Sequence, residues 1–119
     1  MAQPRSRVLV VEDEYFIAEE LRQALERLGT TVVGPVPTGE EALALLKSEP
    51  IDAAVLDINL RGEMSFAVAD ALEERAIPFV FATGYDRAAI PDRFRDVPLW
   101  SKPFDAERLV LTTLQLQQP

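Results

Sequence analysis

The sequence predicts a single-domain α/β fold, in which helices cover both faces of a five-stranded parallel sheet. Short continuous apolar runs, typical of strands buried on both faces, alternate with longer segments in which apolar residues recur at helical spacing. The length of 119 residues suits one domain with its own core. The expected strands cover residues 8–11, 31–33, 53–56, 78–82 and 97–100.

Start and stop signals place the helices between these strands. Gly29 is a C-cap glycine at the end of the first helix. Thr38, followed three residues later by Glu41, resembles a capping box that opens the second helix. Asp105 caps the last helix. The expected helices cover residues 14–28, 38–48, 65–75 and the segment after Asp105.

The connections carry local signals as well. Pro91 interrupts helical hydrogen bonding within residues 86–94, so this segment is predicted to be short or irregular. Turns are predicted at Gly34-Pro35 and Arg61-Gly62. Because parallel neighbours need right-handed crossovers, the alternation of strands and helices predicts a doubly wound sheet with the flavodoxin-like strand order 2-1-3-4-5.

Composition argues against several classes of function. The net charge of −8 disfavours a nucleic-acid partner, because an acidic surface repels phosphates. The chain has no cysteine, which excludes disulfides and thiolate metal sites. The first apolar run is too short for a signal peptide or a membrane span, so we expect a cytoplasmic protein without a membrane role. Residues 115–119 read as a frayed natural end, so residues 1–119 are expected to form one domain with no output domain.

Polar residues stand where four of the predicted strands end. They are Glu12 and Asp13, then Asp57, Thr83 and Lys102. In open α/β sheets ligands bind outside the carboxyl ends of the strands, at the point where the strand order reverses. In the order 2-1-3-4-5 this point lies between strands 1 and 3. The sequence therefore predicts that Glu12, Asp13 and Asp57 lie together.

Clustered carboxylates repel one another unless protons or a cation offset their charge. Without histidine or cysteine, the available ligands are hard oxygens, which favour Mg²⁺. The backbone carbonyl of Asn59 is expected to add a ligand. Asp57 then suits the role of nucleophile, and Lys102 and Thr83 suit the role of donors to transferred oxygens.

These motifs together resemble response-regulator receiver domains: Glu12-Asp13, Asp57, Thr83 and Lys102-Pro103-Phe104 each follow a strand in the right order. The resemblance implies that Asp57 is the phosphoacceptor, served by a histidine kinase or a histidine phosphotransfer protein. It also implies Mg²⁺ bound by Asp13, Asp57 and the backbone of Asn59, with Glu12 in support. The peptide bond before Pro103 is expected to be cis.

The resemblance has consequences for partners. Since the chain has no histidine, the phosphoryl donor must be another protein or a small acyl phosphate. Without an output domain, signalling must pass through contacts with a downstream protein. A monomer or a phosphorylation-dependent dimer is compatible with this role. The chain is expected to be a regulator that assists its own phosphotransfer and dephosphorylation, rather than an enzyme with a separate substrate.

Two positions depart from the usual receiver pattern. The position three before Lys102, which is aromatic in typical receivers, is Leu99, and Trp100 follows it. Residues 78–85 instead resemble the PFxFATGY motif of single-domain regulators linked to bacterial general stress signalling. We therefore expect Thr83, Tyr85 and Trp100 to take part in switching.

Two other functions compete with this interpretation. A pseudo-receiver would bind partners without regard to phosphorylation, and the intact set of acidic residues, threonine and lysine argues against it. An aspartate-nucleophile phosphatase usually carries a second acid two residues after the nucleophile, where this chain has Asn59. Each motif alone is ordinary, since Asp57 at a strand end could be a turn residue. Their conjunction favours the receiver.

Overall fold

A computed structural model describes residues 6–85 and 87–117 and confirms the predicted sheet. Five parallel strands lie in the order β2-β1-β3-β6-β7, which is the flavodoxin-like order predicted from the sequence. The strands are β1 (Arg7–Val11), β2 (Thr31–Val36), β3 (Ala53–Leu56), β6 (Phe79–Thr83) and β7 (Leu99–Ser101).

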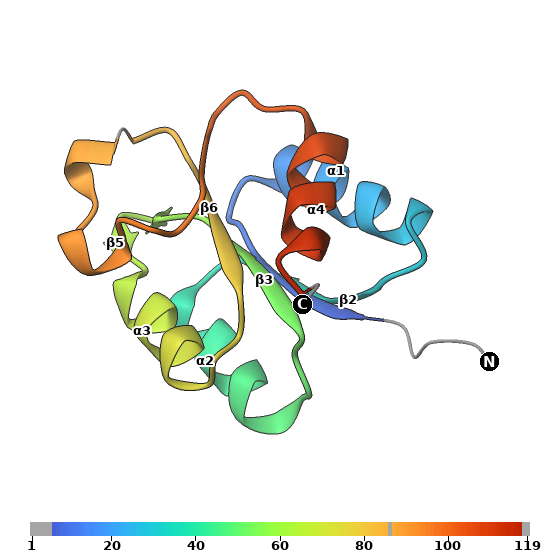
Figure 1. Ribbon diagram of the computed structural model, residues 1–119, viewed down its shortest axis with the longest axis horizontal. Coiled ribbons are helices and arrows are strands. Elements are labelled where there is room, and N and C mark those ends of the chain that lie inside the picture. Colours follow the sequence, from blue (N-terminus) through green and yellow to red (C-terminus); the bar gives the residue numbers. More distant parts are fainter. Residues whose placement is uncertain (1–5, 86, 118–119) are drawn as a thin grey trace.

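Helices cover both faces of this sheet (Figure 1). On one face lie α1 (Tyr15–Arg27) and α4 (Ala106–Gln115), and on the other lie α2 (Gly39–Ser48) and α3 (Phe66–Glu74). Successive strand residues point to opposite faces, so each strand contributes to two separate apolar clusters. Val10 packs with α1 and α4, whereas Leu9 packs with α2 and α3.

The helix ends follow the predicted signals. Gly29 has φ of 80°, a left-handed conformation that ends α1. The Thr38 side chain accepts a hydrogen bond from the Glu41 amide at the start of α2. Asp105 accepts one from the Arg108 amide at the start of α4. These local predictions succeeded because a cap involves only residues three or four positions apart.

The second strand is longer than predicted. β2 continues to Val36, through the Gly34-Pro35 pair that we expected to form a turn. The register shifts here, so the pair forms an irregularity within an edge strand, where a missing proline N–H is tolerated. Gly34 has φ of 92°, and a Cβ at this position would lie 3.0 Å from the Val10 carbonyl oxygen. Only glycine fits this close approach.

The segment before β7 is irregular, as Pro91 predicted. Two 3₁₀ turns, η1 (Arg87–Ala89) and η2 (Asp92–Phe94), occupy it, and its first predicted residue, Asp86, lies outside the described residues. Phe94 anchors the segment, because its ring is 1% exposed and stacks on Phe66 with centroids 5.9 Å apart. Phe94 therefore fixes the segment to the core, although the segment lacks a regular helix and most of its residues are exposed.

A small hairpin follows Asp57 and was not predicted. It pairs β4 (Asn59–Leu60) with β5 (Glu63–Met64) around the turn expected at Arg61-Gly62. Two-residue strands are too short to show an alternating pattern, so the sequence indicates only the turn.

No helix within residues 6–85 and 87–117 is long and apolar enough to cross a membrane. The sequence predictions for the N-terminal residues 1–5 and the final residues 118 and 119 lie outside the described residues.

Replacing Phe94 by alanine is expected to destabilise the protein by about 3–5 kcal/mol, because the change leaves a cavity among Phe66, Phe79 and Phe81. Urea unfolding measures this free energy. Phe16→Ala is the matched control, since Phe16 is 80% exposed, and it should cost less than about 0.5 kcal/mol. Similar losses in both variants would show that Phe94 does not anchor its segment.

Candidate functional site

Strand register brings the predicted polar residues to one edge of the sheet. Val11 of β1 pairs with Leu56 of β3, so the residues that follow, Glu12 and Asp57, become neighbours. Thr83 of β6 pairs with Ser101 of β7, so Lys102 follows directly beside it. Asp57, Thr83 and Lys102 line an open pocket of about 360 Å³. Its lining consists of Asp13, Glu14, Asp57, Asn59, Thr83, Gly84, Tyr85 and Lys102.

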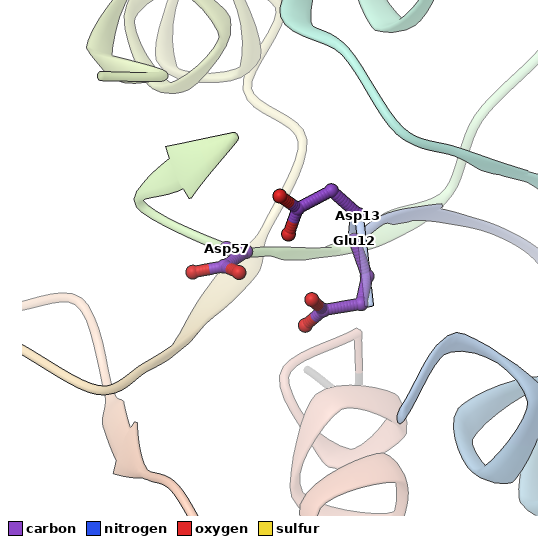
Figure 2. A group of neighbouring side chains, drawn as sticks. All are labelled: Glu12, Asp13 and Asp57. Carbon is purple, nitrogen blue, oxygen red and sulfur yellow. The ribbon is translucent and has the colours of Figure 1, made fainter. Parts of the chain in front are cut away.

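Three carboxylates meet at this edge, as the strand order predicted. Glu12, Asp13 and Asp57 each offer an oxygen, and these oxygens lie within 4.8 Å of one another. Figure 2 shows the three side chains, two following β1 and one following β3. Glu12 and Asp57 are only 3% and 4% exposed, whereas Asp13 is half-buried. Asp13 is thus the most solvent-accessible of the three carboxylates.

Lys102 offsets part of this negative charge. Its Nζ lies 2.9 Å from Asp57 Oδ2 and 3.1 Å from Glu12. A third carboxylate, that of exposed Glu14, lies 3.7 Å away. The Lys102–Pro103 peptide bond is cis, as expected. The Lys102 ammonium faces the three clustered carboxylates and that of Glu14. Because one positive charge cannot balance them all, the pocket keeps an excess of negative charge.

Backbone and hydroxyl groups that the sequence did not single out hold the acidic residues in place. The Ser65 hydroxyl donates a 2.5 Å hydrogen bond to the Asp57 carbonyl oxygen. The amide of Arg61 donates to Asp13 Oδ2 at 2.9 Å. A serine at a helix start could have been noticed in the sequence. A backbone amide has no sequence signal, because every residue except proline carries one.

Tyr85 lies at the rim of the pocket and contacts two of the predicted site residues. Its hydroxyl accepts a 2.7 Å hydrogen bond from the Asn59 side chain, and its amide donates to the Thr83 hydroxyl at 3.1 Å. Trp100 is placed differently, because it is half-buried against the α1 and α4 side of the sheet and does not line the pocket. Leu99 packs against the opposite cluster.

Comparison with known proteins identifies the family. The sequence model of the response regulator receiver domain matches residues 8–113, which is most of the chain. This chain belongs to the response regulator receiver family. Receivers are signalling domains of two-component systems, and their acidic pocket binds Mg²⁺.

Individual relatives support the same assignment. The receiver is 39% identical over 111 residues to the sensory transduction protein LytT of Bacillus anthracis. The aligned region covers 89% of this chain and 45% of LytT. This chain thus spans about half the length of the curated relatives it matches. It is 46% identical to SdrG of Sphingomonas melonis Fr1, with a TM-score of 0.82 and coverage of 97% of this chain and 98% of the SdrG chain. A BeF3-activated conformation of SdrG, from Pseudomonas melonis Fr1, matches at 48% identity with a TM-score of 0.74, covering 91% of this chain and 92% of that one.

Burial shifts the protonation of the receiver's acidic pair. Desolvation, and then the nearby Asp57 charge, raises the pKa of Glu12 to about 8. Desolvation also raises the pKa of Asp57, although the hydrogen bond from Lys102 opposes the shift. Burial alone would lower the pKa of Lys102, but its bonds to Asp57 and Glu12 outweigh this and raise it. Without a divalent cation, Glu12 therefore holds a proton near neutral pH.

The free energy of unfolding of the metal-free receiver is expected to fall as pH rises from about 5 to about 8. Glu12 has a pKa of about 8 when folded and an ordinary value of 4.5 when unfolded, so in this window only the folded state holds the proton. The slope is at most about 1.4 kcal/mol per pH unit for one group. Glu12→Gln should flatten the slope, and Glu74→Gln, an exposed glutamate on α3, should not. Urea unfolding in EDTA at several pH values measures this, and a flat wild-type profile would contradict it.

The residues present fit a magnesium ion. Three carboxylates supply hard oxygen ligands within 4.8 Å of one another. Among the described residues, no donor makes a hydrogen bond to the buried Glu12 Oε1, even though Lys102 Nζ lies 3.1 Å away. An unsatisfied buried carboxylate oxygen is costly, and a nearby cation with its bound water would relieve that cost.

Proposed function

We propose that this protein is a stand-alone response regulator of a two-component phosphorelay, in which Asp57 accepts a phosphoryl group from a histidine kinase or a histidine phosphotransfer protein. One observation carries the proposal: the Asp57 carboxylate lines an open pocket, and Lys102 Nζ lies 2.9 Å from Asp57 Oδ2. A structural ion pair would not need an opening of about 360 Å³ beside it. A phosphoacceptor does, because the donor must reach the carboxylate.

The chemistry is a displacement at phosphorus. A carboxylate oxygen of Asp57 attacks, the P–N bond of the partner's phosphohistidine breaks, and its electron pair remains on the imidazole, which takes a proton from solvent. Lys102 and the Thr83 hydroxyl contact the transferred oxygens. When bound by Asp13, Asp57 and the Asn59 backbone carbonyl, with Glu12 in support, Mg²⁺ offsets the charge of the phosphoryl group and the carboxylates.

In this proposal the signal leaves the receiver through contacts with a downstream protein. Tyr85 is the switch residue, because its amide contacts Thr83 and its hydroxyl contacts Asn59. The PFxFATGY pattern of residues 78–85 supports a role in general stress signalling, and in this proposal the protein acts in the cytoplasm. The partners are the kinase or phosphotransfer protein and a downstream protein that distinguishes the two states.

Intact mass after incubation with acetyl phosphate tests the proposal. In the presence of Mg²⁺ the protein should gain the mass of one phosphoryl group, and in EDTA it should not. An adduct that needs Mg²⁺ would support both the acceptor and the metal site.

The competing function is a pseudo-receiver that binds its partner constitutively. It predicts no adduct with acetyl phosphate and none with a panel of phosphorylated histidine kinases. Both negative results together would contradict the proposed function and favour the pseudo-receiver.

A further inference from the structure

The turn between β4 and β5 has an unusual backbone. Arg61 and Gly62 both have positive φ, at 52° and 86°, which is the conformation of a type I′ hairpin turn. Left-handed φ is uncommon for a residue with a side chain, so Arg61 needs support from its surroundings. The Gly62 amide supplies part of it by donating to Asn59 Oδ1 at 2.9 Å.

This backbone points an amide at the acidic cluster. The N–H of Arg61 donates to Asp13 Oδ2 at 2.9 Å, across 48 residues of sequence. This N–H lies in the peptide plane between Leu60 and Arg61, so the two-residue hairpin loop that fixes the position of Arg61 also fixes where the N–H lies. One oxygen of Asp13 is thereby held, and its second oxygen is left for a cation.

We propose that the Arg61-Gly62 turn is a positioning element that orients the Asp13 carboxylate for Mg²⁺ and so sets the affinity of the site. Groups that hydrogen-bond to metal ligands fix their orientation, and removing such a group typically costs 10–100-fold in metal affinity. The contact comes from the Arg61 backbone, while Gly62 permits the turn. The inference rests on the proposed function, because it assumes that Asp13 is a ligand.

Two glycines offer a matched pair of variants. Gly62 and Gly29 both have positive φ, at 86° and 80°, and a Cβ at either position would meet nothing within 4 Å. Valine therefore introduces backbone strain at both sites, and its Cβ meets no neighbouring atom at either. Only Gly62 lies in the turn that contacts Asp13.

Calorimetric titration with Mg²⁺ measures the affinity of the wild-type protein and both variants. Gly62→Val should weaken Mg²⁺ binding by about 10-fold, whereas Gly29→Val should change it by less than about 2-fold. Equal affinities in all three proteins would overturn the inference alone. A wild-type protein that binds no Mg²⁺ would overturn the proposed function as well.

A second measurement does not depend on how well Gly62→Val folds. In the metal-free protein, Asp13→Ala should speed hydrogen exchange at the Arg61 amide, because its acceptor is lost. Asp52→Ala is the control, since Asp52 Oδ2 accepts from the Arg7 amide at 2.8 Å, and it should affect Arg7 instead. Unchanged exchange at Arg61 in Asp13→Ala would overturn the inference.

Discussion

Replacing Asp57 by asparagine is expected to abolish the phosphoryl adduct that the protein forms with acetyl phosphate and Mg²⁺. The asparagine amide has the same size as the aspartate side chain but is not a nucleophile. It is also uncharged, so it binds a cation more weakly than a carboxylate does. Intact mass spectrometry measures the adduct. The variant should still unfold cooperatively in urea, which separates lost chemistry from lost structure.

Asp96→Asn is the matched control for this change. Asp96 is exposed and precedes β7, so it lies toward the opposite edge of the sheet from the pocket. The Asp96→Asn variant should form as much phosphoryl adduct as the wild-type protein. If Asp57→Asn still gained a phosphoryl group, another residue would be the acceptor, and the assignment of Asp57 would be wrong.

Replacing Lys102 by methionine is expected to lower both stability and phosphotransfer. Lys102 is the ammonium that pairs with buried Asp57 and Glu12, so its loss leaves two buried carboxylates without their cation. Breaking a buried pair in this way costs about 3 kcal/mol or more. Losing one donor to the transferred oxygens should also slow adduct formation by about 100-fold.

Urea unfolding in EDTA at pH 8 and the rate of adduct formation measure the two effects. The chain's other lysine provides the control, because Lys47 is exposed on α2 and Lys47→Met should change neither quantity appreciably. Added Mg²⁺ should restore part of the stability of Lys102→Met, since a cation would again face the carboxylates. No loss of stability in EDTA would mean that the ion pairs of Lys102 are not needed by the fold.

Sequence patterns were sufficient for the sheet order and for the acidic cluster. Apolar runs predict the strands, and topology predicts that neighbouring parallel strands end at the same edge of the sheet. The sequence alone therefore placed Glu12 and Asp57 side by side, as the register of β1 and β3 confirms. Thr83 and Lys102 follow from the same reasoning. The caps at Gly29 and Thr38 are local and were equally predictable.

Other features depend on contacts between distant residues. The Gly34-Pro35 pair was wrongly predicted as a turn, because such a pair is typical of turns when only the sequence is known. The structure shows that glycine is needed there because a Cβ would lie too close to the Val10 carbonyl oxygen. The rim contact between Asn59 and Tyr85 spans 26 residues, and its geometry comes from the packing of β6 beside β3.

The sequence by itself determined the fold, the receiver family resemblance and the types of residue at the strand ends, because these depend on periodicity, spacing and side-chain chemistry. The tertiary structure alone decided how the acidic residues are held. The Arg61 amide reaches Asp13 through a left-handed turn, and the Ser65 hydroxyl holds the Asp57 backbone. The reason is physical: every residue except proline carries the same backbone amide, so its direction exists only once the chain has folded.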